Sequence, residues 1–304
     1  MIILAIYKLN ILKMYLLSGS SNQNLAKDVA IITKTQIIER TIHTFTDGEI
    51  KITLKNQNLA SEHVTILQTI SNSNQLIELC FLIDALKASG VKKISLIVPY
   101  LFYARQDTPK KGEAFVPSVI IKILENSGIN DITYLDLHSN KVQNIFSIPN
   151  RELNITPLLT NIITKNCIIV APDSGAAKRA KNVSAYFGLD LVHIEKNRSE
   201  KGKVFSKLEE HKVQNKNCFI IDDIIDSGNT LLETVKVLKN QGASSIKAFC
   251  THGVLSNDHW LNLCDSDLDH LFITNSIDIE AKVKNFDKIS IINLSSLISQ
   301  FLEK

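Results

Sequence analysis

The sequence has no apolar run long enough to cross a membrane, since a spanning helix needs about 20 consecutive apolar residues. The opening stretch MIILAIYKLNILKM comes nearest, but Lys8 and Lys13 interrupt it. No small-residue cleavage site follows it, so it lacks the pattern of a secretory leader. We therefore expect no membrane association, and we expect residues 1–13 to be a poorly ordered extension before a natural start at Met14.

An excess of charge of one sign is also missing. The chain has 34 Lys and Arg against 31 Asp and Glu, a net charge of +3. This balance predicts a mixed, solvated surface and argues against a nucleic-acid partner. The five cysteines include no C-x-x-C pair, and Cys167, Cys218 and Cys250 lie in apolar runs. A free thiol there behaves as a small hydrophobic group, which indicates reduced core cysteines in a cytoplasmic protein.

Short, β-branched apolar runs alternate with segments of helical period along most of the 304 residues. Near-continuous apolar strands separated by helices are typical of parallel sheets covered on both faces, so we predict an α/β protein. The length suggests two domains, and the Pro- and Asn-containing stretch at 147–157 suggests their boundary. We predict an N-terminal domain at 14–150, a C-terminal domain at 151–290, and a final helix at 291–304 that packs back on the first domain.

Polar residues follow most of the predicted strands. They occur in the segments YARQD, DLHSN, PDSGA, EKNR, DDIIDSGNT and THGVL. Ligands of parallel α/β sheets bind beyond the carboxyl ends of the strands. The sequence therefore predicts a functional site built from these segments.

The stretch FIIDDIIDSGNT, residues 219–230, has the most specific pattern. We predict a strand that ends at Asp222 and Asp223, then a loop, then a helix that begins near Thr230. Backbone N–H groups at a helix start suit a phosphate, and ionised carboxylates suit the hydroxyl donors of a sugar. The stretch thus favours a pocket for a phosphorylated sugar. The alternative is an acidic strand end followed by a capping box between Thr230 and Glu233.

This stretch resembles the phosphoribosyl-diphosphate loop of type I phosphoribosyltransferases and, more closely, of ribose-phosphate diphosphokinases. The likeness to the second family covers Met14 to the C-terminus and continues, in the family's order, in FTDGE, PYLFYARQD, DLHSNKVQNIFSIP, APDSGAAKRA and EKNR. It implies two doubly wound parallel-sheet domains of the type I phosphoribosyltransferase-like fold. It also implies transfer of the diphosphoryl group of ATP to the anomeric hydroxyl of ribose 5-phosphate, giving phosphoribosyl diphosphate and AMP for nucleotide biosynthesis.

The resemblance assigns the ATP contacts to the first domain. In FTDGE it implies that Phe45 contacts the adenine and that Asp47, Gly48 and Glu49 bind ATP beside it. It also implies that this ATP site is shared between subunits of a homo-oligomer. A D-G turn is the plain alternative for this segment. In YARQD it implies contacts from Arg105, Gln106 and Asp107. An Arg directly after a strand suits triphosphate oxygens, because its planar guanidinium bonds phosphate in pairs.

The resemblance assigns ribose 5-phosphate to the acidic loop and to one Arg of EKNR: Asp222, Asp223, Asp226, Ser227, Gly228, Asn229, Thr230 and Arg198. It implies Mg²⁺ as the cofactor, with His138 and Asp173 at the metal sites. Mg²⁺ prefers oxygen ligands, so Asp173 suits the role and His138 suits a partial or indirect one. A His at a strand end is otherwise a hydrogen-bonded structural residue.

The resemblance implies that Lys196 and Arg198 perform the chemistry. Diphosphoryl transfer needs positive charge where negative charge develops on phosphate oxygens, and these two side chains supply it. The polar segment after Arg198 would close over bound substrates as a lid. A solvated basic loop is the alternative.

Three features depart from the family's usual pattern. The segment after Arg198, SEKGKVFSKLEE, lacks the usual Pro-rich pattern, so we expect the lid to differ in sequence. Residues 108–118, TPKKGEAFVPS, resemble the archaeal-like and divergent branch, which argues against regulation by ADP of the common bacterial kind. Asn229 stands where a small residue is usual, and Asn tolerates a left-handed backbone better than most residues. Two other functions stay open: a phosphoribosyltransferase, and a catalytically silent regulatory homologue. Retention of Lys196 and Arg198 argues against silence.

Overall fold

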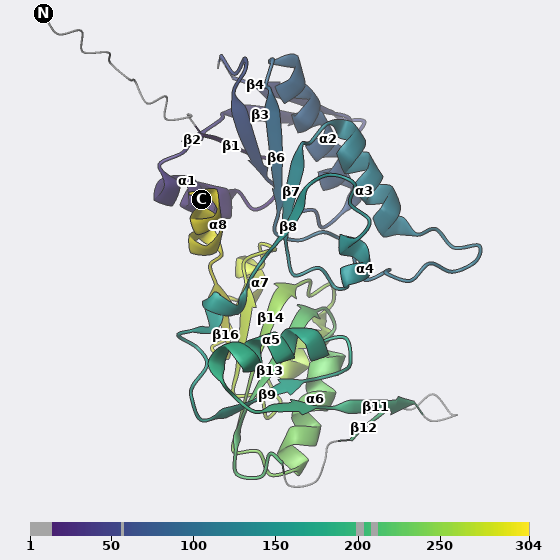
Figure 1. The fold of residues 1–304 in the computed structure, drawn as a ribbon, viewed down its shortest axis with the longest axis vertical. Helices are drawn as coiled ribbons and strands as arrows, with labels where there is room; N and C mark the ends of the chain where they lie inside the picture. The colour runs from purple at the N-terminus through teal and green to yellow at the C-terminus, as the bar shows by residue number, and fades with distance from the viewer. Residues whose placement is uncertain (1–13, 56–57, 199–203, 208–211, 304) are drawn as a thin grey trace, which may run out of the picture.

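The computed structural model describes most of the chain: residues 14–55, 58–198, 204–207 and 212–303. For the segments 195–198 and 204–207 it describes the backbone alone. The predicted extension at 1–13 lies outside the described residues. Two six-stranded sheets and two two-stranded ribbons form from the described part of the chain. The two sheets follow one another along the long axis of the molecule (Figure 1).

All strands of the first sheet pair in parallel. In spatial order they are β2 (Gln36–Ile37), β1 (Tyr15–Ser18), β5 (His63–Leu67), β6 (Lys93–Val98), β7 (Asp131–Leu135) and β8 (Asn150–Leu153). The sheet continues to Leu153, past the boundary predicted at residue 150, because β8 pairs with β7 along its whole length.

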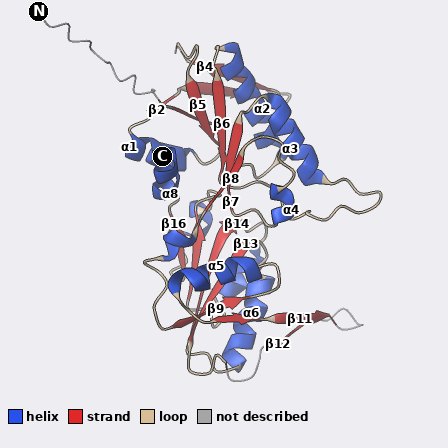
Figure 2. Ribbon diagram, in the orientation of Figure 1, coloured by secondary structure: helices blue, strands red, loops and turns tan. Residues whose placement is uncertain are grey.

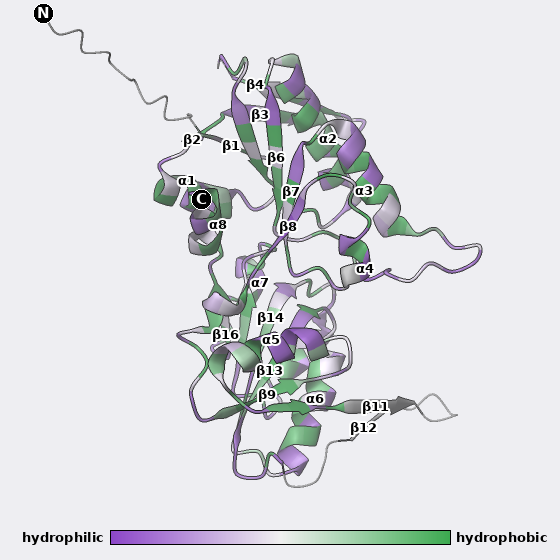
Figure 3. Ribbon diagram, in the orientation of Figure 1, coloured by the Kyte–Doolittle hydropathy of each residue, from purple (hydrophilic) through white to green (hydrophobic). Residues whose placement is uncertain are grey.

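The second sheet is also parallel throughout. Its spatial order is β10 (Leu191–His193), β9 (Cys167–Ala171), β13 (Asn217–Ile225), β14 (Ser245–Gly253), β15 (His270–Thr274) and β16 (Ile289–Ile292). Hydrophobic residues run along the strands of both sheets, as sheets covered on both faces require (Figure 3).

Helices connect the strands and cover the sheets (Figure 2). They are α1 (Gln23–Thr33), α2 (Ser73–Ala88), α3 (Val116–Ser127), α4 (Asn140–Gln143), α5 (Ala177–Phe187), α6 (Asn229–Asn240), α7 (Glu280–Val283) and α8 (Ser295–Leu302), with 3-10 turns η1 (Thr156–Leu159) and η2 (Asp258–Leu263). Two of them, α3 and α5, end at Gly128 and Gly188, whose φ angles of 109° and 66° suit a residue without Cβ. The predicted α/β fold with two doubly wound parallel sheets is confirmed.

One apolar cluster joins the two sheets. It contains Leu16 and Ile97 of the first sheet, Phe219 and Ile221 of the second, and Ile298 of α8. The C-terminal α8 packs against α1 of the first domain (Figure 1). The two domains therefore share buried apolar surface in addition to their own cores.

Two antiparallel ribbons extend from the sheets. The first is β3 (Arg40–Thr44) with β4 (Ile50–Leu54), and the second is β11 (Glu195–Arg198) with β12 (Val204–Lys207). The five cysteines are free, and three of them are buried. Among the described residues, no helix is both long and apolar enough to span a membrane.

Candidate active site

The carboxyl ends of the strands in the two sheets face each other. Asn22, after β1, donates its side-chain amide to the backbone oxygen of Asn275 at 2.8 Å, and Thr69, after β5, donates its hydroxyl to that of Ser276 at 2.6 Å. Asn275 and Ser276 follow β15 of the second sheet. We call the contact between the ends of β1, β5, β6 and β7 and the ends of β13, β14 and β15 the interdomain seam. Polar segments of both domains meet there.

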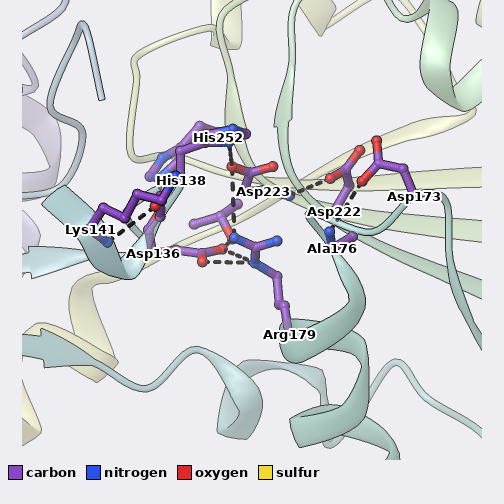
Figure 4. Close-up of polar contacts among 11 residues, drawn as sticks. Asp136, His138, Lys141, Asp173, Ala176, Arg179, Asp222, Asp223 and His252 are labelled. Atoms are coloured by element: carbon purple, nitrogen blue, oxygen red, sulfur yellow. Dashed lines mark hydrogen bonds and ion pairs between the residues drawn. The ribbon is translucent and has the colours of Figure 1, made fainter. Parts of the chain in front are cut away.

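Asp136 lies at the centre of the seam, directly after β7, and is buried (Figure 4). Arg179 of α5 donates its Nε to both carboxylate oxygens of Asp136, at 2.7 and 2.8 Å. Thr251 of β14 donates its hydroxyl to the same carboxylate. His252 donates its Nε2 to the backbone oxygen of Asp136 at 3.2 Å, and its Nδ1 lies 2.9 Å from the hydroxyl of Ser276. One residue of the first domain is thus held by three residues of the second.

His138, two residues after Asp136, contacts the second domain through Asp223. Its Nδ1 lies 2.6 Å from Oδ2 of Asp223, and the guanidinium of Arg179 lies 3.7 Å from that oxygen. The hydrogen bond to Asp223 raises the pKa of His138. Burial alone would raise the pKa of Asp223, but His138 and Arg179 together hold it below its usual value. With Nδ1 bonded to a carboxylate, Nε2 is the ring nitrogen that could bind a ligand.

Asp222 and Asp173 place two further carboxyl groups beside this pair (Figure 4). Burial raises the pKa of Asp222 well above its usual value, and the carboxylates of Asp223 and Asp173 raise it further. Asp173 accepts a hydrogen bond from the backbone N–H of Ala176 at 3.2 Å, at the start of α5. Crowded carboxylates of this kind fit a divalent cation. Among the described residues, however, no three His, Cys, Asp or Glu side chains form a metal site by themselves.

The phosphate loop differs from its prediction in three respects. β13 runs on to Ile225, so Asp222 and Asp223 lie inside the strand and not at its end, because Ile224 and Ile225 continue the pairing with β14. The helix α6 begins at Asn229 after Gly228 as its N-cap, without a side-chain capping hydrogen bond, so the capping-box alternative is wrong. The left-handed φ of 80° falls on Gly228, and Asn229 is helical.

Asp226, like Asp223, contacts the first domain. Its Oδ2 lies 3.1 Å from Nη2 of Arg105, and its Oδ1 accepts hydrogen bonds from the backbone N–H and the hydroxyl of Ser256. Burial would raise the pKa of Asp226, but these hydrogen bonds lower it. The segment ARQD of the first domain therefore lies against the acidic loop of the second.

A cavity of about 940 Å³ opens beside His138, between α5 and the ends of β7 and β8. Its lining includes Asp107, Asp136, Lys178 and Tyr186. Burial would raise the pKa of Asp107, but hydroxyls of Ser139 and Thr108 lower it. Gln106, one residue earlier, donates its backbone N–H to the backbone oxygen of Tyr103.

The segment FTDGE is not part of the seam. Its residues form the turn of the β3–β4 ribbon, in which Gly48, with φ 91°, donates its N–H to the backbone oxygen of Phe45. Asp47 accepts the N–H of Glu49 at 3.0 Å. Phe45 is 44% exposed, and the ribbon lies toward the end of the first domain that is far from the second (Figure 1). The D-G turn is thus present, and within one chain this segment does not join the other predicted ATP contacts.

Lys196 and Arg198 lie on β11, opposite Ser206 and Val204 of β12. The β11–β12 ribbon projects from the second domain (Figure 1). The side chains of Lys196 and Arg198 lie outside the described residues, and so do most of the residues of the predicted lid. Their catalytic assignment stays a prediction.

Sequence reasoning missed the residues that join the domains, among them Arg179, Thr251 and His252. Arg179 lies in a helix rich in Lys and Ala, where a basic residue normally faces solvent. The signal that could have found it is its position in the first turn after the loop of Asp173. His252 stands in THGVL, one of the polar strand ends, which is a weak signal of the same kind.

The fold and the seam define a class of protein: two-domain α/β proteins with two phosphoribosyltransferase-like sheets and a polar site between them. Comparison with known families agrees. Residues 14–128 match the N-terminal domain of ribose phosphate pyrophosphokinase, and residues 141–266 match the phosphoribosyl transferase domain.

Individual relatives extend this match to nearly the whole chain. A ribose-phosphate pyrophosphokinase of Aquifex aeolicus is 30% identical over 297 residues, covering 95% of this chain and 94% of the relative. One of Brucella melitensis is 31% identical over 299 residues, covering 96% of each. The crystal structure of phosphoribosylpyrophosphate synthetase from Mycobacterium smegmatis matches with a TM-score of 0.87 at 28% identity, covering 96% of this chain and 98% of the other. The chain belongs to the ribose-phosphate pyrophosphokinase family.

Proposed function

We propose that this chain is an ATP-dependent ribose-phosphate diphosphokinase. The anomeric oxygen of ribose 5-phosphate attacks the β-phosphorus of ATP and the bond between that phosphorus and the α,β-bridging oxygen breaks. The products are phosphoribosyl diphosphate and AMP, and the hydroxyl proton is released. The contact between Arg105 and Asp226 carries the proposal, because it joins the segment assigned to ATP with the loop assigned to ribose 5-phosphate.

The loop before α6 would hold ribose 5-phosphate. The backbone N–H groups from Ser227 to Thr230 lie at the amino end of α6, a helix of 12 residues. The helix dipole favours a phosphate at this end. Asp226 is less buried than Asp222 and Asp223 and would accept hydrogen bonds from the ribose hydroxyls. Asp222 and Asp223 are buried. We propose that they belong to the ribose 5-phosphate site and lie behind Asp226.

The opposite wall would hold ATP. Arg105, with Gln106 and Asp107, would contact the triphosphate. Asp173 and His138 would hold Mg²⁺ together with phosphate oxygens and water, since Mg²⁺ keeps several ligands that are not protein side chains. When bound, Mg²⁺ neutralises the charge of the transferred group. The raised pKa of Asp222, caused in part by the carboxylates of Asp223 and Asp173, supports this assignment. A nearby cation would stabilise these carboxylates in their ionised form.

Lys196 and Arg198 are proposed to stabilise the charge that develops on the diphosphoryl oxygens. The β11–β12 ribbon supports this proposal, because a projecting ribbon is able to bring side chains over a site from one side. The proposal also includes a contact of Arg198 with ribose 5-phosphate.

The turn of the β3–β4 ribbon supports a shared ATP site. Phe45 is half exposed and far from the seam of its own chain, while an adenine contact needs an aromatic face. We propose that Phe45, with Asp47, Gly48 and Glu49, reaches the ATP site of a second copy in a homo-oligomer. The five free cysteines support a reducing location, for which we propose the cytoplasm.

One assay tests the function. Purified protein is incubated with ribose 5-phosphate, ATP and Mg²⁺, and AMP and phosphoribosyl diphosphate are quantified. We expect both products in equal amounts, and neither without ribose 5-phosphate. A folded, oligomeric protein that forms no AMP would contradict the proposal and favour a regulatory homologue. Consumption of phosphoribosyl diphosphate with a free base would instead favour a phosphoribosyltransferase.

A further inference from the structure

Arg179 connects the two domains at the point where the proposed metal site and ribose site meet. It lies in the first turn of α5, in the second domain, and its side chain is only 11% exposed. Its Nε bonds both oxygens of Asp136 in the first domain, at 2.7 and 2.8 Å, and its Nη2 lies 3.7 Å from Oδ2 of Asp223. One cation thus serves two buried carboxylates of different domains.

The backbone around Asp136 depends on this contact. Asp136 has a left-handed φ of 38°, which is unfavourable for a residue with a Cβ and persists only where neighbours hold it. Arg179 and Thr251 hold its carboxylate, and His252 holds its backbone oxygen. The direction in which the chain leaves β7 toward His138 is therefore set from the second domain.

Charge explains why Arg179 matters for His138 as well. Without a cation between them, the buried carboxylates of Asp136 and Asp223 would repel each other, and Asp136 would also lose the two hydrogen bonds from Arg179. Asp223 is also the residue that receives Nδ1 of His138 at 2.6 Å. A shift of Asp223 would turn the imidazole and move its Nε2, because Asp223 holds the ring through Nδ1.

We propose that Arg179 is a positioning residue for diphosphoryl transfer, which rests on the function proposed above. It binds Asp136 and Asp223 across the seam and thereby keeps His138, and the two substrate-binding halves, in one relative placement. It does not touch the reacting atoms itself.

The test compares Arg179→Met and Arg179→Lys with a control on the same helix, Lys181→Met, whose side chain is exposed. We expect Arg179→Met to lower kcat by about 10- to 100-fold, with a similar rise in the Mg²⁺ concentration for half-maximal rate, as for other residues that orient metal ligands. The KM for ribose 5-phosphate should change less than about threefold, because Arg179 reaches the ribose side only through Asp223, which lies behind Asp226. Lys keeps the charge but cannot bridge two carboxylates in a fork, so Arg179→Lys should recover only part of kcat.

A second readout does not depend on catalysis. Hydrogen–deuterium exchange in Arg179→Met should increase at residues 136–139 and remain as in the parent in β9 and β13. If Arg179→Met does not fold, Arg179→Lys and Asp136→Asn take its place. Exchange that increases throughout the second domain, or a folded variant with kcat and Mg²⁺ dependence within about twofold of the parent, would overturn the proposal. If the parent protein forms no AMP, the proposed function fails, and exchange at 136–139 alone decides whether Arg179 positions this loop.

Discussion

Adjacent carboxylates at Asp222 and Asp223 have different surroundings although their residue type is the same. Successive residues of a strand point to opposite faces of the sheet. Phe219, Ile221 and Asp223 therefore share the face covered by α5, and Asp223 meets Arg179 and His138 there. Among the described residues no cationic side chain bonds Asp222, so burial dominates and its pKa is raised, while that of Asp223 is lowered. The pair cannot be described as two equivalent acids that face the sugar.

At the same scale, Lys196→Ala tests the proposed catalytic cation. Loss of one charge that stabilises the transition state should lower kcat by about 10² to 10³, whereas ATP binding should largely survive because Arg105 and its neighbours remain. Steady-state kinetics and calorimetric titration with ATP measure the two quantities. Lys122→Ala, an exposed residue on α3, serves as the control and should keep both values. A near-normal kcat in Lys196→Ala would rule out the assignment.

His252 predicts a pH dependence of stability. Burial lowers its pKa below the ordinary value of 6.5, so below that pH the unfolded chain binds a proton that the folded chain does not. The free energy of unfolding should then fall by up to about 1.4 kcal/mol per pH unit as the pH decreases, until the folded imidazole also protonates. His252→Gln should lack this component, and urea unfolding between about pH 5.5 and 7.5 measures the difference. Parallel curves for the parent and the variant would exclude it.

At the scale of elements, the 24 residues of β13, the loop and α6 must form both a buried strand and a helix start that binds phosphate. The strand needs apolar residues that pair on both sides, and the helix start needs a chain reversal that leaves N–H groups unbonded. Gly228 provides the reversal with a φ of 80°. Its neighbour Asn229 is helical, so the departure from the family pattern at that position does not alter the turn.

Gly228→Ala should damage this unit. The new Cβ would lie 3.0 Å from Cδ1 of Leu263. The alanine would also have to adopt the left-handed backbone of Gly228, at a cost of about 1–3 kcal/mol. We expect a lower unfolding temperature and a higher KM for ribose 5-phosphate. Gly188→Ala is the matched control, because its φ is 66° and nothing lies within 4 Å of the added Cβ. It should lose stability by a similar backbone cost, and its KM should stay unchanged; equal KM values in both variants would contradict the assignment of the loop.

At the scale of the whole molecule, two kinds of contact join the domains. The polar contacts of the seam define how the strand ends face each other. Behind them, the apolar cluster that contains Ile97, Phe219 and Ile298 spans both sheets. Because α8 is attached to the second sheet through β16 and packs on α1, the end of the chain ties the second domain to the first.

Ile298→Ala tests this tie. The side chain is fully buried, so its truncation should lower the free energy of unfolding by about 2–5 kcal/mol. Ile31→Ala on α1 is the control, since Ile31 is 75% exposed and should change stability by less than about 0.5 kcal/mol. Chemical denaturation followed by circular dichroism measures both. Equal stability of the two variants would show that α8 contributes little to the folded protein.

The sequence alone determined the α/β fold, most strands and helices, and the segments that gather at the strand ends. These follow from local pattern: apolar runs pair as buried strands, and Gly at helix ends and polar residues after strands mark the connections. It also carried the family resemblance that the comparisons bear out.

Only the tertiary structure decided which of these residues meet. That Asp223 faces His138, that Arg179 bridges two domains, and that His252 holds the backbone oxygen of Asp136 depend on contacts between residues 43 to 116 positions apart. Such contacts arise when two separately patterned sheets pack end to end, and no local period in the chain encodes them. The ribbon of Lys196 and Arg198 follows the same rule, because the direction in which it projects depends on the second domain as a whole and not on the four residues of β11.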